Sequence, residues 1–268
     1  LGAAGTGGFA CRNSGQADYT VYQQAVITIF MLLFGVNFNV YYLLLIRRPK
    51  DAGRCEELRG YLAVVAIAIL LITINIRSLF PSLFMAFHQA AFQVSSIITT
   101  TGYSTIDYNS WPEFSKTILL LIMFIGACAG STGGGIKVSR VLILLKSVKK
   151  ELKQYLHPSA VEKIKMDGKI VEHEVVRSTN VFMVAYVLIF AVSVLLISLD
   201  EYDLVTNFTA VTATFNNIGP GLALVGPTGN FGFFSNFSKV VLIFDMLAGR
   251  LEIFPLLLLF SRETWKRF

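Results

Sequence analysis

The chain has 268 residues, of which 54% are hydrophobic and only 15% are charged. These are too few charges to cover a soluble globule of this size, which excludes a disordered chain, a nucleic-acid binder and a disulfide-stapled secreted domain. Cys11, Cys55 and Cys128 are scattered and show neither metal-type pairing nor a disulfide framework. The net charge is +6, and the composition as a whole predicts an integral membrane protein.

Charge-free stretches predict the membrane-spanning helices. Four of them contain no Asp, Glu, Lys or Arg and are long enough, or nearly so, to cross a bilayer: 20–46, 60–76, 117–136 and 178–199. A fifth stretch, 240–260, is equally apolar apart from three charged residues. Since a helix needs about 20 apolar residues to cross about 30 Å of hydrocarbon, we expect an all-α, multi-spanning membrane protein.

The lysines and arginines indicate the topology of these spans. Most of them fall in the segments 47–59, 137–177 and 261–268, whereas 78–115 and 178–238 contain none. By the positive-inside rule, the three basic segments lie in the cytoplasm and the two segments without basic residues face outside. The basic surplus is therefore a topology signal, and nucleic-acid binding is the weaker interpretation.

The two outer segments, 78–115 and 200–236, are unusually apolar for loops. Neither is long enough to cross the membrane and return, so their apolar parts are expected to be re-entrant helices. Backbone of this kind is tolerated at membrane depth only where protein buries it or water lines it. The pattern predicts a pore or a substrate pathway.

An internal repeat links these segments. The sequence FQVSSIITTTG at 92–102 parallels FTAVTATFNNIG at 208–219, and the triplet Phe-Ser-Lys at 114–116 recurs at 237–239. A fainter third copy is the GTGGF sequence at 5–9. The repeated unit is span, pore helix, filter-like loop and span.

The three loops carry a glycine at the same point of the repeat, and their predicted filter residues are Thr6, Gly7, Gly8 and Phe9; Thr100, Thr101, Gly102 and Tyr103; and Asn217, Ile218, Gly219 and Pro220. Glycine permits conformations that turn successive carbonyls in one direction, and rings of carbonyls replace the hydration shell of K⁺ in potassium channels. A tight turn would explain any one loop, but three loops at equivalent positions favour a filter. K⁺ is expected at Thr100, Thr101, Gly102, Asn217, Ile218 and Gly219.

The segment AGSTGGGIK at 129–137 suggests a phosphate-binding loop at first sight. That motif needs Lys directly after its last Gly, whereas Ile136 intervenes here and an apolar helix precedes the glycines. Four glycines within six residues instead predict a helix broken in mid-membrane, next to a water-filled cavity. A passive hinge is the less favoured interpretation, because a hinge without a gating role would not need the charge of Lys137.

Arg250 lies in the middle of the fifth apolar stretch. An intramembrane arginine costs several kcal/mol unless it is paired or faces a cavity. Asp245 and Glu252 are at sequence offsets that do not share its helical face. We therefore expect Arg250 to contact carbonyls of the loop 130–135, while a structural pair with an acidic residue stays open as the alternative.

The segment GACAGSTGGGIKVSR at 126–140 resembles the signature of the Trk/Ktr/HKT superfamily of potassium transport proteins, most closely its bacterial Trk membrane subunits. TTTGYST at 99–105, GVNFNVYY at 35–42 and MLAGRLEIFPLL at 246–257 match the same family. The resemblance runs essentially from end to end.

The resemblance implies four repeats around a central pore. It makes 1–46 the end of the second repeat with its filter loop and inner span, 59–151 the third repeat with a broken inner helix, 152–176 a cytoplasmic linker and 177–268 the fourth repeat. The chain starts at Leu1, just before a filter loop. We therefore expect a longer parent protein that also carries the first repeat and the rest of the second.

The resemblance also implies a gate beneath the filter, in which an arginine acts as a cationic barrier. The gating residues would be Gly130, Ser131, Thr132, Gly133, Gly134, Gly135, Lys137 and Arg250. It further implies K⁺ as the transported ion with no covalent cofactor, a place among the lipids of the bacterial inner membrane, a homodimer, and a cytosolic nucleotide-binding regulatory subunit as partner.

Three functions compete. The first is potassium uptake through a passive or weakly coupled filter, and the alternative is a Na⁺- or H⁺-coupled potassium symporter. A symporter needs buried carboxylates in the pathway, for which only Asp245 and Glu252 qualify. An intramembrane enzyme is a poor third, since the sequence has no paired-Asp motif, no Gly-x-Ser-x-Gly and no His-Glu-x-x-His.

Overall fold

The computed structural model describes residues 2–8, 15–157 and 163–251, together with 253, 255 and 258. In this part the chain forms the α-helices α1 (Gly2–Gly5), α2 (Val21–Phe34), α3 (Phe38–Leu45), α4 (Pro49–Arg54), α5 (Glu56–Ile76), α6 (Leu83–Ile98), α7 (Glu113–Ile125), α8 (Val138–Leu156), α9 (His173–Ile197), α10 (Leu204–Phe215) and α11 (Asn236–Leu251). Short 3₁₀ turns are at Arg77–Leu79, Tyr108–Ser110, Ser198–Asp200 and Ala223–Val225. The strands β1 (Lys165–Met166) and β2 (Lys169–Ile170) pair antiparallel in a small hairpin between α8 and α9. The fold is thus almost entirely helical, as the sequence predicts.

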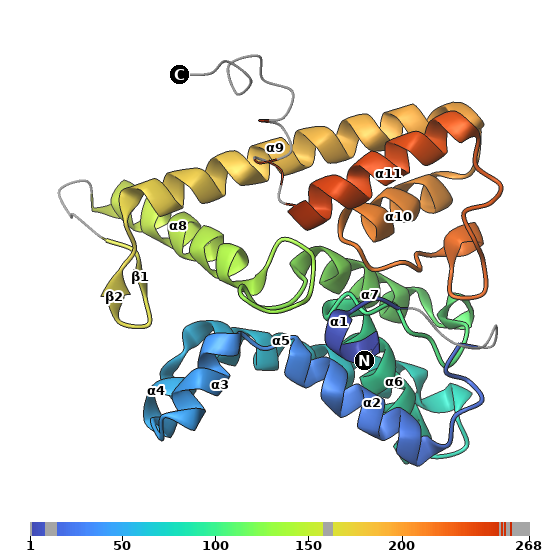
Figure 1. The fold of residues 1–268 in the computed structure, drawn as a ribbon, viewed down its shortest axis with the longest axis horizontal. Coiled ribbons are helices and arrows are strands. Elements are labelled where there is room, and N and C mark those ends of the chain that lie inside the picture. The colour runs from blue at the N-terminus through green and yellow to red at the C-terminus, as the bar shows by residue number, and fades with distance from the viewer. Residues whose placement is uncertain are drawn as a thin grey trace.

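Among the residues that the structure describes, two helical segments are long and apolar enough to cross a membrane, Glu56–Leu79 and His173–Asp200. They contain α5 and α9, and they correspond to the predicted spans 60–76 and 178–199. In Figure 1, α9 runs along one edge of the molecule with α10 and α11 beneath it, while α2, α5 and α6 form the opposite half. Helix α7 lies between the two halves.

The predicted span 20–46 is not one straight helix. It is divided into α2 and α3, whose axes meet at 90°. The side chain of Asn37 caps α3 by accepting a hydrogen bond from the backbone N–H of Asn39 at 2.9 Å. Gly35 sits at the break because a Cβ there would lie 2.5 Å from the Tyr61 hydroxyl oxygen of α5. Gly35 thus permits close packing against a second helix at the bend, and apolar patterning does not reveal this contact.

The predicted span 117–136 is interrupted at the glycine run, as expected. Helix α7 ends at Ile125, residues 126–137 form a loop, and α8 begins at Val138. Gly126 has a φ of 71° and Gly135 has a φ of 79°, which favour glycine. The loop returns along the end of α7, since the N–H groups of Ile136 and Lys137 donate to the carbonyls of Phe124 and Ile125.

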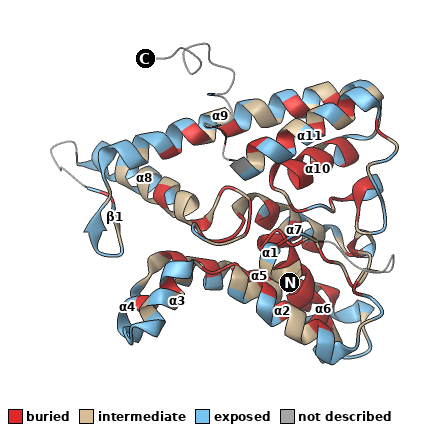
Figure 2. Ribbon diagram, viewed as in Figure 1, coloured by how far each residue is buried: buried red, intermediate tan, exposed pale blue. Residues whose placement is uncertain are grey.

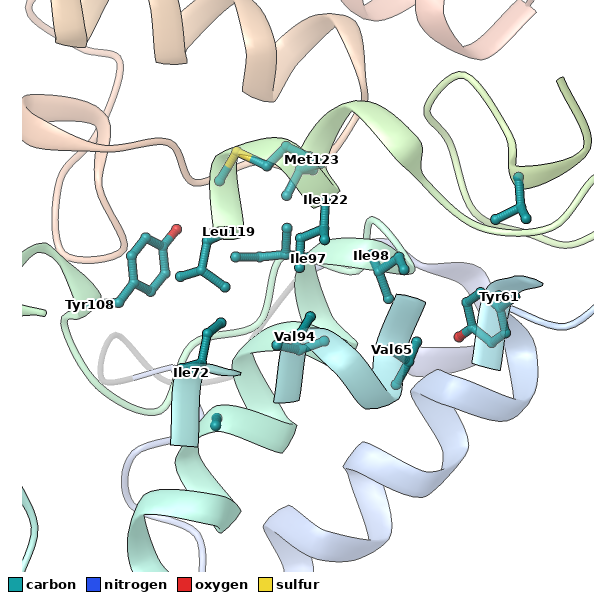
Figure 3. Packing of buried hydrophobic residues seen from close by; sticks show 14 of the residues in the cluster. Tyr61, Val65, Ile72, Val94, Ile97, Ile98, Tyr108, Leu119, Ile122 and Met123 are labelled. Atoms are coloured by element: carbon teal, nitrogen blue, oxygen red, sulfur yellow. The ribbon is translucent and has the colours of Figure 1, made fainter. Parts of the chain in front are cut away.

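The two short apolar helices, α6 and α10, lie deeper in the protein than the long ones. Nearly every residue from Gln89 to Ile98 is buried, and so are most of those from Thr206 to Phe215. Figure 3 shows why for α6: Val94, Ile97 and Ile98 lie between side chains of α5, such as Ile72, and side chains of α7. Short helices enclosed by longer ones fit the predicted pore helices.

The long helices instead expose apolar side chains on their outer faces. Exposed residues of α5 and α9 include Ile67, Leu70, Ile74, Val184, Leu188, Val192 and Leu195. A face of this size and polarity suits lipid hydrocarbon rather than water. The fold therefore has the residue distribution typical of a membrane protein: polar residues lie on the buried short helices, and apolar residues lie on the outer surface.

Candidate functional site

The three predicted filter loops share one backbone conformation. Each begins with a non-glycine residue in the left-handed region, namely Thr6, Thr100 and Asn217, with φ of 45°, 55° and 56°. Two residues later each has a glycine with positive φ, namely Gly8, Gly102 and Gly219, with φ of 66°, 78° and 106°. Left-handed backbone is uncommon for Thr. Its recurrence at equivalent positions means that the repeat seen in the sequence is also present in the backbone conformation.

The hydrogen bonds that hold these loops also repeat. After α6, the N–H groups of Thr101 and Gly102 donate to the carbonyl of Ser96 at 2.9 and 3.3 Å. After α10, those of Ile218 and Gly219 donate to the carbonyl of Ala213 at 2.8 and 3.5 Å. In both loops the N–H groups are therefore used by a carbonyl near the end of the preceding helix.

The loops also lie against one another. A Cβ added to Gly8 would be 2.4 Å from the carbonyl oxygen of Thr101, and one added to Gly102 would be 2.0 Å from that of Ile218. Each glycine thus abuts the middle residue of the next loop, and no side chain fits there. This close approach explains the glycine at two of the three positions, whereas a Cβ on Gly219 would meet no described atom within 4 Å.

The short helices α6 and α10 both end at the predicted filter loops. Ser82 caps the start of α6 and Asp203 caps the start of α10, each through its side-chain oxygen. A helix C-terminus carries the negative end of the helix dipole, so both helices favour a cation near the loops. Hydrogen bonds from the Thr206 side chain and backbone N–H hold the pKa of Asp203 below its ordinary value, so this outer carboxylate stays charged.

The loop 126–137 contacts two of the predicted filter loops and the residue just before the third. The Thr6 hydroxyl donates to the carbonyl of Thr132 at 3.0 Å, and the N–H of Gly134 donates to the Thr100 hydroxyl at 2.7 Å. A Cβ added to Gly134 would lie 2.5 Å from the carbonyl oxygen of Asn216. The glycines therefore allow the loop to approach the neighbouring backbone closely, in addition to breaking the helix.

Arg250 meets the same loop. Its guanidinium Nη1 donates to the carbonyl of Thr132 at 2.9 Å, across 118 residues of sequence. This is the contact with a loop carbonyl that the sequence analysis expects. Lys137, at the other end of the loop, donates through Nζ to the carbonyl of Gly133. Two cations are thus held at carbonyls of this loop.

A cavity of about 260 Å³ lies below this loop. It is lined by residues 131–135, by side chains of α9 and α11, and by the cations Lys137, Arg140 and Arg250. The guanidinium of Arg140 stands over the ring of Phe182, 4.1 Å from its centroid. A larger cavity of about 760 Å³ lies above, bordered by residues 5–7 and 217–219, and Arg250 lines it as well. Arg250 therefore borders both the cavity lined by residues 5–7 and 217–219 and the cavity lined by the glycine-rich loop.

The remaining predicted residues are distributed as follows. Tyr103 is buried and its carbonyl accepts a hydrogen bond from the Ser96 hydroxyl at 2.6 Å. Phe9 and the side chain of Glu252 lie outside the described residues. Asp245 lines neither of the two cavities above; it is fully buried, with the Ser193 hydroxyl donating to its Oδ1 at 2.6 Å.

Two residues that hold the site, Tyr186 and Glu57, are not predicted from the sequence. The Tyr186 hydroxyl donates to Oδ1 of Asn216 at 2.9 Å and so fixes the last residue before the fourth-repeat filter loop. Glu57 is 5% exposed and accepts hydrogen bonds from Asn37, Ala129 and Ser139. Glu57 gives no sequence signal, because it lies within the charged segment 47–59.

Comparison with known proteins identifies the family of the chain. A family model described as TrkH, cation transport protein, matches residues 61–267. The Trk system potassium uptake protein TrkH of Escherichia coli K12 is 39% identical over 244 residues, covering 90% of this chain and 50% of the relative. The protein of the same name from Vibrio parahaemolyticus is 38% identical over 267 residues, covering 97% and 54%. TrkG of E. coli K12 is 35% identical over 268 residues, covering 97% and 54%.

A solved structure has the same fold. The crystal structure of the potassium transporter TrkH from V. parahaemolyticus superposes with a TM-score of 0.91 at 35% identity, covering 99% of this chain and 57% of that one. The chain thus spans about half the length of the relatives it matches. With both the family model and the fold in agreement over most of its length, the chain belongs to the TrkH family of cation transport proteins.

Proposed function

We propose that this chain forms part of a potassium uptake protein of the bacterial inner membrane, in which the three loops are sides of a carbonyl-lined filter. The observation that carries the proposal is the shared backbone of the loops, with left-handed Thr6, Thr100 and Asn217 each followed two residues later by a positive-φ glycine. A carbonyl filter selects K⁺ by replacing its hydration shell. The relatives are named as potassium uptake proteins, which supports the same ion as cargo.

Gating is assigned to the loop 126–137 together with Arg250. The hydrogen bond from Arg250 to the Thr132 carbonyl joins α11 to the loop directly beneath the filter. A cation in a narrow path repels K⁺, and the loop blocks the same path sterically, so flux requires that the loop and arginine move apart. The cations that line the lower cavity support a barrier to cations at this depth.

Asp245 supports the coupled symporter as the second candidate. Its Oδ2 is buried with no hydrogen-bond partner among the described residues, a state that suits a protonated carboxyl. Its position between α9 and α11, away from the linings of both cavities, favours a structural role instead.

The proposed partners are a second copy of the protein and a cytosolic nucleotide-binding regulatory subunit. The naming of the relatives as parts of a Trk system supports a multi-component assembly. On this chain, α8 and the β1–β2 hairpin offer a basic surface for such a subunit, with Lys149, Lys150 and Lys153 on the last turns of α8.

Uptake of ⁸⁶Rb⁺ by the full-length protein in proteoliposomes tests the function. We expect a K⁺ gradient alone to drive Rb⁺ accumulation, without Na⁺ and at equal pH on both sides. Uptake that needs a Na⁺ or pH gradient would favour the symporter. Equal rates with and without the protein, in vesicles that contain folded protein, would contradict both.

A further inference from the structure

Glu57 is a buried carboxylate to which the proposed filter and gate assign no role. It lies in the first turn of α5, is 5% exposed, and accepts three hydrogen bonds from three separate segments. Its Oε1 accepts from the backbone N–H of Ala129 at 2.6 Å and from that of Ser139 at 3.2 Å. Its Oε2 accepts from Nδ2 of Asn37 at 3.1 Å.

The two backbone partners stand on either side of the glycine run. Ala129 precedes it, and Ser139 is the second residue of α8. The residue at the N-cap of α8, Lys137, provides no side-chain cap, so the first N–H groups of α8 need an acceptor from elsewhere. Glu57 supplies it from α5, and a carboxylate at a helix N-terminus is also favoured by the helix dipole.

The third partner connects the loop to the break between α2 and α3. Asn37 uses Nδ2 for Glu57 and Oδ1 to cap α3 through the N–H of Asn39. Around it, the N–H of Phe38 donates to the carbonyl of Gly130, and the N–H of Cys128 donates to that of Gly35, both at 3.1 Å. One carboxylate therefore joins the bend of the second repeat to both ends of the loop in the third.

We propose that Glu57 is a positioning residue that holds the loop 126–137 in its observed place beneath the filter loops by tying Ala129, Ser139 and Asn37 together. The effect on ion flux rests on the proposed gating function. The same contacts would also serve folding alone, so the test needs a variant that restores the hydrogen bonds without restoring Glu57.

A side-chain exchange provides that variant. In Glu57→Gln the new amide nitrogen meets the Nδ2 of Asn37, so two donors face each other. In Asn37→Asp two carboxylates face each other, which is unfavourable in a buried place. The double variant, Glu57→Gln with Asn37→Asp, reverses the polarity of the pair. Its new amide oxygen accepts from Ala129 and Ser139 while the amide nitrogen donates to the new carboxylate, whose other oxygen still caps α3.

Glu56→Gln is the matched control for these variants. Glu56 is adjacent to Glu57 in the first turn of α5, but it pairs instead with Lys146. The control therefore makes the same chemical change one residue away, without touching the three hydrogen bonds. It should leave the position of the loop unchanged.

The native Cys128 reports the position of the loop independently of flux. It is fully buried and directly precedes Ala129. We would measure its rate of modification by a membrane-impermeant maleimide, in full-length protein with every other cysteine replaced. Each single variant should raise this rate by roughly tenfold or more, as expected for losing hydrogen bonds to a charged group, and the double variant should return it toward that of the unmodified protein. Because the charge of Glu57 disfavours the reactive thiolate of Cys128 by itself, Asn37→Asp is the deciding single variant. It keeps that charge and adds a second carboxylate, so faster labelling in Asn37→Asp reports a moved loop.

The outcomes separate the two proposals. Single variants that label like the unmodified protein, or a monodisperse double variant that labels like the singles, would overturn the role of Glu57. In a third outcome, the labelling rate rises in the single variants and returns in the double variant, but the Rb⁺ leak in the absence of any activator stays constant. Glu57 then does position the loop, and it is the gating role of the loop that fails. A parallel rise and restoration of leak supports both.

Discussion

Replacing Gly102 with serine should reduce Rb⁺ uptake by roughly tenfold or more and remove any preference for K⁺ over Na⁺, because about 2 kcal/mol or more of strain must be relieved by moving the loop. The residue has a φ of 78°, and a Cβ at this position would lie 2.0 Å from the carbonyl oxygen of Ile218. One of the two loops must shift, and the carbonyls that would replace the hydration shell shift with it. Uptake and Na⁺ competition in bacteria deficient in potassium uptake measure the effect.

Gly168→Ser is the control for this variant. Gly168 has a nearly identical φ of 76°, in the turn between β1 and β2, but a Cβ there would meet no described atom within 4 Å. The Gly168→Ser variant introduces the same backbone strain as Gly102→Ser but no steric clash, so uptake should be retained. Normal, selective uptake by Gly102→Ser at equal protein level would mean that these loops are not the filter.

Replacing Arg250 with alanine should increase Rb⁺ leak in the absence of any activator. The variant loses the hydrogen bond to the Thr132 carbonyl, which leaves the loop less firmly held. It also removes a cation from the path: two unit charges about 4 Å apart repel by about 4 kcal/mol at an effective dielectric constant of about 20, which makes a rise of roughly tenfold or more reasonable. Arg250→Lys keeps the charge and should leak less than Arg250→Ala.

Arg77→Ala removes one positive charge at an exposed position just after α5 and controls for net charge. It should leave the leak unchanged. If Arg250 instead serves only as a structural partner of an acidic residue, Arg250→Ala should yield less folded protein with no increase in flux per molecule. That result would remove Arg250 from the gate.

The sequence predicts much of this architecture because its signals are physical constraints that act locally. The lack of charge in 60–76 and 178–199 corresponds to the long helices α5 and α9. The glycines at 130–135 predict the break between α7 and α8, since no continuous helix tolerates such a run. The equivalence of Gly8, Gly102 and Gly219 also follows from sequence alone, because each needs a positive φ that few other residues adopt.

The rest depends on contacts between distant segments. At the 90° bend between α2 and α3, Gly35 lies close to Tyr61, and nothing in the apolar pattern of 20–46 reveals the bend or this contact. The capping of α8 by Glu57 joins residues 82 positions apart. Glu57 has the same appearance in the sequence as its neighbour Glu56, and only the fold makes one of them buried and the other a partner of Lys146.

The position of the ion itself is the most direct test of the filter. A crystal structure of the full-length protein in Rb⁺, with anomalous scattering recorded at the rubidium edge, locates the cation without reference to function. We expect a peak among the carbonyls of Thr100, Thr101 and Gly102 and of Asn217, Ile218 and Gly219. Rubidium bound elsewhere in the pore, with none at these carbonyls at concentrations that saturate uptake, would contradict the proposed filter.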